Sequence, residues 1–328
     1  MAAILVTGAM GFIGSNFVLH WMRQHPHDRV VALDALTYAG NTENVAAVSG
    51  LPHFRFVHGD IADAQLIHQL FVEESIDTLV HFAAESHVDR SIADPQAFVR
   101  TNVLGTQCLL EAARRGQVRK FVHISTDEVY GSLGDEGYFT ETTPLAPNSP
   151  YSASKAGSDC LARAYYETFG LPVVITRCSN NYGPYQHPEK LVPTIITQAL
   201  RDEPIPVYGD GRNVRDWLHV EDHCEAIALA ITQGVPGEVY NVGGHNERTN
   251  LEVVRTVLAE LGKPESLIRF VPDRPGHDRR YAIDASKIGR ELGWRPRYTF
   301  ELGMKQTVEW YSGHTAWWTR WLQREEGT

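Results

Sequence analysis

A short apolar run leads straight into a loop of spaced glycines, and this feature constrains the fold more than any other. Residues 4–7 have the length and composition of a buried strand, and residues 12–24 carry apolar side chains at helical spacing. Between them lies Gly8-Ala-Met-Gly11-Phe-Ile-Gly14. Glycines so placed let a backbone approach a pyrophosphate at a helix N-terminus. A plain tight turn is the alternative, and the rest of the chain must decide between the two.

Segments typical of strands and of helices alternate through the first half of the chain. Such alternation predicts an α/β fold with a doubly wound parallel sheet of the Rossmann type. The expected strands are residues 29–33, 54–57, 78–82, 121–124 and 173–176, and the expected helices are residues 64–74, 95–116 and 151–169.

The alternation weakens after about Gly183, where prolines break the chain into short pieces. Helical patterns return at residues 220–233 and 251–261, and the tryptophans of the last twenty residues indicate a late packed helix. We therefore predict a Rossmann domain over residues 1–183. A smaller C-terminal lobe over residues 184–328 is expected to interleave with it and to bind the substrate.

Composition excludes several classes of protein. The formal net charge is -10, whereas a nucleic-acid binder would carry a basic surface. The four cysteines form no C-x-x-C pair and no zinc spacing, which indicates free thiols in a reducing compartment. No apolar stretch suits a signal peptide or a membrane span, so we expect a cytoplasmic protein. An anionic ligand would need a local positive patch, with Arg177, Lys190, Arg215, Arg274, Arg279 and Arg280 as candidates.

Two strand ends support a dinucleotide site. Asp34 ends the second strand about 20 residues after the glycine loop, where a carboxylate holds the ribose hydroxyls of NAD. No arginine follows it at once, so the 2′-phosphate of NADP would be repelled. Asp60 and Ile61 follow the third strand, where adenine often rests. The sequence therefore predicts NAD as the cofactor.

Tyr151 and Lys155 are four residues apart, so on a helix they share one face. A lysine ammonium beside a tyrosine hydroxyl favours the phenolate and lowers the phenol pKa. A phenolate can take a proton from a sugar hydroxyl while hydride leaves the same carbon. The alternative is an ordinary amphipathic helix, but Ser125 at a strand end upstream favours the redox pair.

Two adjacent acids, Asp127 and Glu128, follow the strand at residues 121–124. A solvated loop is the usual place for adjacent acids. In a closed site, however, neighbouring carboxylates with different surroundings hold different protonation states, which suits acid/base chemistry.

Six motifs together carry a resemblance that covers nearly the whole chain. The chain resembles the extended short-chain dehydrogenase/reductase superfamily and, within it, the dTDP-glucose 4,6-dehydratases. The triplet Thr126-Asp127-Glu128 is the most diagnostic part, since related epimerases and decarboxylases usually lack the acidic pair. The motifs are residues 8–14, 81–91, 125–131, 151–155, 177–190 and 273–278.

The resemblance implies a redox-neutral lyase that acts on a nucleotide-linked hexose. NAD would take hydride from C4 with Tyr151 as the base, water would leave across C5 and C6, and hydride would return to C6. Glu128 is implied as the C5 base, Asp127 as the C6 acid and Thr126 as a hydrogen-bond partner of the sugar.

The resemblance also assigns binding residues and an assembly. A homodimer through the helices around residues 95–115 and 151–169 is expected, although either helix could simply cover the sheet. The cofactor set is Gly8, Gly11, Phe12, Ile13, Gly14, Asp34, Leu36, Thr37, Asp60, Ile61, Phe82, Ala83, Ala84, Ser86, Thr101, Ser125, Tyr151, Lys155 and Asn181. The substrate set is Ser86, His87, Thr126, Asp127, Glu128, Tyr151, Asn180, Lys190, Leu191, Pro206, Tyr208, Arg215, Asn250, Arg274 and His277.

Three alternatives stay open. The chain could be another nucleotide-sugar 4,6-dehydratase, or a UDP-sugar epimerase or decarboxylase on the same scaffold, although the acidic pair argues against the latter. A non-catalytic NAD-binding regulator would have no need of both Tyr151 and Lys155. No metal is expected, because His219 and His223 lack an acidic helper and Asp222 suits a helix cap better.

Overall fold

The computed structural model describes residues 2–273 and 276–326, and it is built around a seven-stranded sheet in which all strand pairs are parallel. The strand order is β10-β6-β5-β4-β1-β2-β3. This confirms the predicted doubly wound α/β class. The strands are β1 (Ala3–Thr7), β2 (Arg29–Asp34), β3 (Phe54–His58), β4 (Thr78–His81), β5 (Lys120–Thr126), β6 (Val173–Cys178) and β10 (Val239–Val242).

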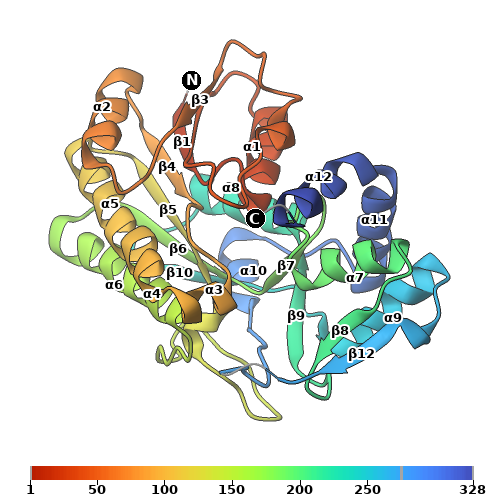
Figure 1. The fold of residues 1–328 in the computed structure, drawn as a ribbon. Coiled ribbons are helices and arrows are strands. Elements are labelled where there is room, and N and C mark those ends of the chain that lie inside the picture. The colour runs from red at the N-terminus through yellow and green to blue at the C-terminus, as the bar shows by residue number, and fades with distance from the viewer. Residues whose placement is uncertain (1, 274–275, 327–328) are drawn as a thin grey trace.

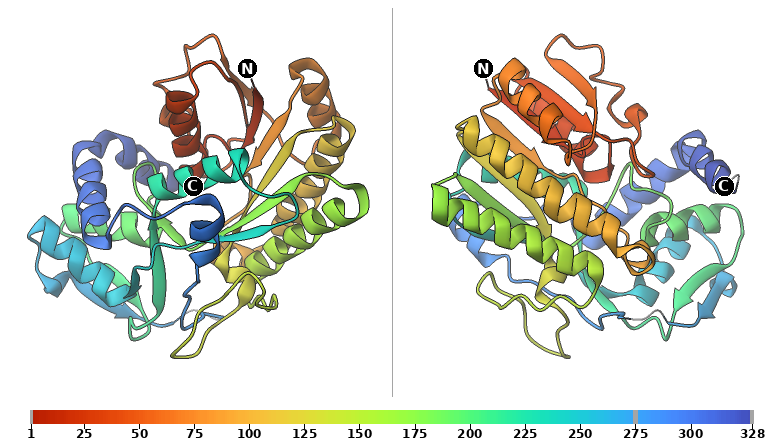
Figure 2. Two further views of the ribbon diagram at one scale, coloured as in Figure 1. Left: turned by 180° about the vertical axis from the view of Figure 1, so that it is seen from behind. Right: turned by 60° about the vertical axis from the view of Figure 1, so that its left-hand side comes forward.

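Helices cover both faces of this sheet, and each face has its own apolar core (Figures 1 and 2). Because strands covered on both faces are buried throughout, every residue of β1 and β4 is buried, and β1 carries an apolar run over its first four residues. One face carries α1 (Phe12–Gln24), α8 (Val220–Thr232) and α10 (Ser286–Leu292), and the other carries α2 (Ala64–Glu74), α5 (Thr106–Arg115) and α6 (Pro150–Phe169).

The segment predicted as one helix over residues 95–116 is interrupted. It consists of α4 (Pro95–Phe98), a π-helical segment η2 (Val99–Gly105) and α5, and it follows the short α3 (Val88–Ala93). Within η2, the Asn102 side chain accepts a hydrogen bond from the backbone N–H of Glu85 (2.9 Å) and donates one to Ser154 Oγ (2.8 Å). These partners come from other parts of the chain and hold the wider turn in place.

The later part of the chain forms an apolar cluster of its own beside the sheet, on the right of Figure 1. The division predicted at residue 183 stays a prediction; α8 and β10, which follow that residue, lie with the large sheet. The smaller part contains β7 (Asn180–Tyr182), β8 (Ile205–Tyr208), β9 (Val214–His219), β11 (Glu247–Thr249), β12 (Ile268–Val271), α7 (Leu191–Leu200), α9 (Asn250–Leu261) and α11 (Phe300–Gly313).

The helix α12 (Thr315–Glu326) returns to the loop that follows β2, near the start of the chain (Figure 1). Trp317 Nε1 donates a hydrogen bond to Asn44 Oδ1 (3.0 Å), and Arg320 pairs with Glu43. Both partners belong to the short helix η1 (Thr42–Val45). Among the described helices, none combines the length and apolar character needed to cross a bilayer.

Candidate functional site

A cavity of about 370 Å³ opens at the carboxyl ends of the strands, where β1 and β4 lie side by side. The chain leaves β1 toward one edge of the sheet and β4 toward the other, so this is the switch point at which doubly wound sheets bind ligands. The glycine loop, the end of β2, the residues after β3 and β4, the end of β5 and the segment after β6 all contribute to its lining.

The glycine loop forms a cradle that only glycine fits. Gly8 has φ +68°, and a Cβ there would lie 2.6 Å from the Ala83 backbone nitrogen. A Cβ on Gly14 would lie 2.1 Å from the Gly8 carbonyl oxygen. The helix α1 begins after Gly11 and has no side-chain cap, so the N–H groups of its first turn remain available to bind an anion in the cavity.

Asp34 ends β2 with its carboxylate fixed in the wall of the cavity. Its Oδ2 accepts a hydrogen bond from Met10 N–H (2.9 Å) and its Oδ1 accepts one from Leu36 N–H (2.8 Å). Burial raises the pKa of this carboxyl group. A Cβ on Gly40 would come within 2.9 Å of Asp34 Oδ1, so the lack of a side chain at Gly40 leaves room for the carboxylate. The cradle and this acid suit the pyrophosphate and ribose of a dinucleotide.

Tyr151 and Lys155 lie on the face of α6 that covers β5, and both side chains are buried. Lys155 Nζ donates a hydrogen bond to the Ile124 carbonyl oxygen (2.7 Å), and burial lowers the pKa of Lys155 to about 8. Burial first, and the Glu128 carboxylate second, raise the pKa of Tyr151 well above its usual value, whereas a hydrogen bond with Thr126 lowers it. The predicted lowering of the phenol pKa by Lys155 is therefore wrong for this structure: the pKa is raised, and Lys155 is not among the groups that shift it.

The acidic pair occupies the short helix η3 (Asp127–Tyr130) at the end of β5, and its two members have different surroundings. Asp127 is 1% exposed, and its Oδ2 has no hydrogen-bond partner among the described residues. Burial, and then the neighbouring Glu128 carboxylate, raise the pKa of Asp127 well above its usual value. Glu128 is half-buried, and its N–H donates to Thr126 Oγ1 (3.2 Å). Asp127 is therefore suited to donate a proton.

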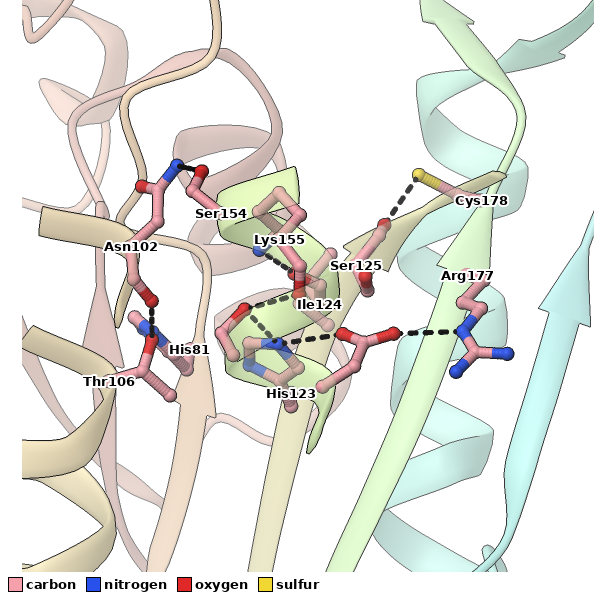
Figure 3. A network of polar contacts seen from close by, with 12 residues as sticks. His81, Asn102, Thr106, His123, Ile124, Ser125, Ser154, Lys155, Arg177 and Cys178 are labelled. Atoms are coloured by element: carbon pink, nitrogen blue, oxygen red, sulfur yellow. Dashed lines mark hydrogen bonds and ion pairs between the residues drawn. The ribbon is translucent and has the colours of Figure 1, made fainter. Parts of the chain in front are cut away.

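Beneath these groups lies a buried polar layer (Figure 3). His81 Nδ1 lies 2.8 Å from Thr7 Oγ1, and its Nε2 lies 2.9 Å from Thr106 Oγ1. Arg177 donates from Nε to Asp159 Oδ2 (2.8 Å) and is 6% exposed. Arg177, a candidate for an anion-binding patch by sequence, thus lies in the interior with a carboxylate partner.

Most of the residues assigned by sequence come together in this cavity. Its lining includes Gly8, Gly11, Phe12, Ile13, Gly14, Asp34, Thr37, Asp60, Ile61, Phe82, Ala83, Ala84, Ser86, Thr101, Ser125, Thr126, Asp127, Glu128, Tyr151, Lys155, Asn180, Asn181 and Lys190.

Three assigned residues sit at the border of the cavity rather than in its wall. Leu36 contributes the N–H that binds Asp34. His87 caps α3, and its Nε2 lies 3.6 Å from the carboxylate of Glu189, which does line the cavity. Leu191 is the first residue of α7, directly after Lys190.

The remaining assigned residues lie on the smaller part of the molecule, outside the cavity wall. Arg215, in β9, lies with its guanidinium 4.2 Å from the Tyr281 ring centroid and donates to the Asp278 carbonyl oxygen (2.9 Å). Tyr208 and His277 form an edge-to-face ring pair. Pro206 is in β8, Asn250 begins α9, and Arg274 lies outside the described residues.

Electrostatics place the Arg215 group next to the acidic pair. The charge of Arg215 is one of the influences that lower the pKa of Asp127, although burial outweighs it. The pKa of Tyr281 is raised by burial and then by Glu128. A ligand that reached from the cavity toward Arg215 would therefore pass the two acids.

Sequence reasoning missed several polar side chains in the cavity wall. Tyr38 is half-buried under the Arg90 guanidinium, which is 3.7 Å from its ring centroid, and burial raises the pKa of its hydroxyl group. Its only signal is its place shortly after Asp34. Gln186, His187 and Glu189 also line the cavity. They belong to the motif at residues 177–190, but the resemblance assigns no role to these three positions.

The two histidines considered for a metal point into different surroundings. His219 stacks on the Tyr298 ring at 4.0 Å, and His223 Nδ1 lies 2.9 Å from Asn181 Oδ1. Within residues 2–273 and 276–326, no group of three or more His, Cys, Asp or Glu side chains could hold a metal ion.

Comparison with known proteins extends over almost the whole chain. A family model described as GDP-mannose 4,6 dehydratase matches residues 5–307. A dTDP-glucose 4,6-dehydratase of Xanthomonas campestris pv. campestris is 58% identical, over 97% of this chain and 95% of that protein.

Solved structures agree with the sequence matches. The dTDP-glucose 4,6-dehydratase of Streptomyces venezuelae, solved with NAD bound, is 54% identical with a TM-score of 0.94, covering 97% of this chain and 99% of that one. The dTDP-glucose 4,6-dehydratase of Bacillus anthracis, in complex with NAD, is 51% identical with a TM-score of 0.92, covering 98% and 100%. The chain therefore belongs to the dTDP-glucose 4,6-dehydratase family of the extended short-chain dehydrogenase/reductase superfamily.

Proposed function

We propose that this protein converts dTDP-glucose to dTDP-4-keto-6-deoxyglucose and water, with NAD as a cofactor that is regenerated in each cycle. The observation that carries the proposal is the buried, partner-poor carboxyl group of Asp127 beside Glu128, in the same cavity wall as Tyr151. Epimerisation needs no such acid, whereas loss of water needs both a base and an acid.

The glycine cradle would hold the pyrophosphate of NAD, and Asp34 its adenosine ribose. When bound, NAD accepts a hydride, releases it later in the cycle and places a positive charge in the cavity. Tyr151 accepts the proton of the C4 hydroxyl group as that carbon becomes a ketone. The Lys155 ammonium, one helical turn away, would have to offset the effect of burial on the Tyr151 pKa and so favour the phenolate form that this step requires.

The C4 ketone makes the C5 proton acidic. Glu128 removes that proton, and Asp127 donates a proton to the departing C6 hydroxyl group, which leaves as water. Burial and the neighbouring Glu128 raise the pKa of Asp127, which favours the protonated form that a general acid needs. Hydride addition at C6 and return of a proton from Glu128 to C5 then complete the 4-keto-6-deoxy sugar, and Asp127 regains a proton as Tyr151 releases the one that it accepted. Thr126, which caps η3 and hydrogen-bonds Tyr151, would also hydrogen-bond the sugar.

The nucleotide half of the substrate would lie toward the smaller part of the molecule. Arg215 offers the planar donor group that suits a diphosphate, and Lys190 offers a point charge. Further roles for Pro206, Tyr208, Asn250, Arg274 and His277 belong to the same proposal.

A cytoplasmic homodimer through the helices around residues 95–115 and 151–169 is also part of the proposal. Large apolar side chains exposed on these helices support it: Val99 is 56%, Leu104 47% and Phe169 53% exposed. Sedimentation of the purified protein measures this assembly directly.

The decisive experiment incubates the purified protein with dTDP-glucose, UDP-glucose and GDP-mannose and follows each product by mass. We expect loss of one water from dTDP-glucose and transfer of a C4 deuterium label to C6. A product of unchanged mass and inverted C4 would establish an epimerase, and cofactor binding without turnover would establish a regulator. Loss of water from another nucleotide sugar alone would change the substrate but keep the mechanism.

A further inference from the structure

A buried carboxylate that the proposed reaction does not use lies directly below the redox pair. Asp159 follows Lys155 by four residues on α6, so the two side chains lie on one face of the helix. Asp159 is 2% exposed and Lys155 is 4% exposed. Burying an ionised carboxylate is costly unless it is paired, so its position needs an explanation.

Two residues of the sheet, both labelled in Figure 3, lie against the Asp159 carboxylate: Arg177 donates a hydrogen bond to it, and His123 lies close to it. Its Oδ2 accepts the hydrogen bond from Arg177 Nε (2.8 Å), and its Oδ1 lies 3.2 Å from His123 Nε2. Arg177 is itself anchored, because its Nη1 donates to the Tyr130 hydroxyl group (2.9 Å), which donates to Asn241 Oδ1 (2.8 Å). The anion therefore has a fixed position under the site. These contacts lower the pKa of Asp159 to about 2 despite its burial.

The other titratable groups that face Lys155 come from every element packed against it, and they are neutral. Burial lowers the pKa of His81 on β4 and of His123 on β5, with the Lys155 charge adding to the effect in both. Burial raises the pKa of Cys178 on β6 to about 12, so this group is a thiol. Tyr151 above keeps its proton for the reason given earlier. Asp159 is thus the anion that offsets the burial of Lys155.

We propose that Asp159 is a positioning residue whose carboxylate, fixed by Arg177 and His123, keeps the Lys155 ammonium charged beneath Tyr151. This inference rests on the proposed function for its catalytic consequence, because only a charged Lys155 favours the Tyr151 phenolate. Its physical content, the charge state of Lys155, can be measured without any sugar.

The two members of the Arg177–Asp159 pair provide variants that test the charge. Asp159→Asn removes the anion and keeps the size of the side chain, so Lys155 should lose its proton at lower pH. Arg177→Lys keeps a cation beside the anion, so Lys155 should titrate as in the wild type. A purely structural pair would instead give damage of the same kind in both variants.

The direct readout is the titration of Lys155 by NMR on protein labelled at lysine. The chain contains only six lysines, and the Lys155→Gln variant identifies the signal of interest. The wild-type midpoint should lie near the value of about 8 set by burial. Because a neighbouring opposite charge shifts a pKa by about 1–3 units, we expect Asp159→Asn to lower the midpoint by about one pH unit or more. Arg177→Lys should leave it unchanged.

The second readout is the pH dependence of turnover with dTDP-glucose. The alkaline limb of kcat should move to lower pH in Asp159→Asn and should stay in place in Arg177→Lys, with little change in KM. An unchanged Lys155 midpoint in Asp159→Asn, or an equal downward shift in both variants, would overturn the proposal. If Asp159→Asn does not fold, Asp159→Ser takes its place, and a midpoint that does not fall in that variant overturns the proposal. Wild-type protein that shows the expected titrations without dehydrating any sugar would instead overturn the proposed function.

Discussion

At the scale of single residues, the two adjacent acids show how position separates chemical roles. Asp127 points into the interior and Glu128 stays half-buried, although the two differ by one position in the chain. The turn of η3 after β5 sends neighbouring side chains in different directions. The same strand end therefore supplies a proton donor and a base.

We expect Glu128→Gln to separate oxidation from dehydration. The amide cannot take the C5 proton, so product formation should fall by about 10²–10⁴-fold, the usual contribution of a general base. Oxidation at C4 does not need Glu128, so nicotinamide absorbance should still appear when dTDP-glucose is added and should then persist. Asp127→Asn serves as the control, because it should also slow water loss. Normal turnover of Glu128→Gln would remove this residue from the mechanism.

A second residue-scale prediction concerns Asp34. Its carboxylate accepts two backbone hydrogen bonds and faces the space for the adenosine ribose. Hydrogen bonds to charged groups contribute about 1.5–3 kcal/mol, so Asp34→Ala should weaken NAD binding by roughly 10–100-fold. Calorimetric titration with NAD and NADP measures this. Wild-type protein that bound NADP as tightly as NAD would contradict the role of this carboxylate.

The sequence was most informative where geometry depends on local spacing. The glycine loop, Asp34, and the Tyr151–Lys155 pair all follow from distances along the chain within one strand–loop–helix unit. Glu189 could not be found in that way, since a loop from a separate part of the chain brings it to the cavity. Tyr38 follows Asp34 by four residues, but no local spacing rule marks a tyrosine there. The hydrogen bond from Lys155 to the Ile124 carbonyl oxygen likewise depends on how α6 rests on β5.

At the scale of secondary structure, α6 organises the site. Tyr151, Lys155 and Asp159 recur every four residues, so one helix face carries the base, the cation and the anion. The helix begins with Pro150 after a capping box between Ser149 and Ser152. By contrast, the π-helical turn η2 in the neighbouring segment could not be predicted, because it depends on the distant partners of Asn102.

We expect the cap of α6 to affect activity as well as stability. Ser149→Ala removes an N-cap acceptor and should lower the free energy of unfolding by about 1 kcal/mol, measured by denaturant titration. Fraying of the first turn would also displace Tyr151, so kcat should fall. Thr299→Ala, at the N-cap of α11, provides the matched control with a similar stability loss and unchanged kcat. Equal kcat values in both variants would contradict the link between this cap and the site.

At the scale of the whole molecule, burial of histidines makes the fold sensitive to acid. The pKa values of His187, His219 and His223 are lowered to about 3, 4 and 3, chiefly by burial. At a pH between its folded pKa and the unfolded pKa of 6.5, each of these histidines therefore binds a proton when the protein unfolds. The contribution of these groups to the free energy of unfolding is therefore complete above pH 6.5 and declines as the pH falls below that value.

His223 allows this effect to be isolated. Its imidazole is fully buried with Nδ1 2.9 Å from Asn181 Oδ1, and an asparagine could keep that contact. Relative to His223→Asn, the wild type should lose about 1.4 kcal/mol of unfolding free energy per pH unit between pH 6.5 and pH 4. Denaturant titrations at several pH values measure the difference. A constant difference would show that His223 does not titrate on unfolding.

The return of α12 to the loop after β2 also has a consequence for biosynthesis. A ribosome makes the glycine loop and Asp34 long before β10 and then α12. Until then the large sheet lacks its edge strand, and η1 lacks the hydrogen bond from Trp317. The loop beside the cofactor site thus acquires this support only after the whole sheet has been made, so release of chains stalled before α12 would leave that loop without its brace.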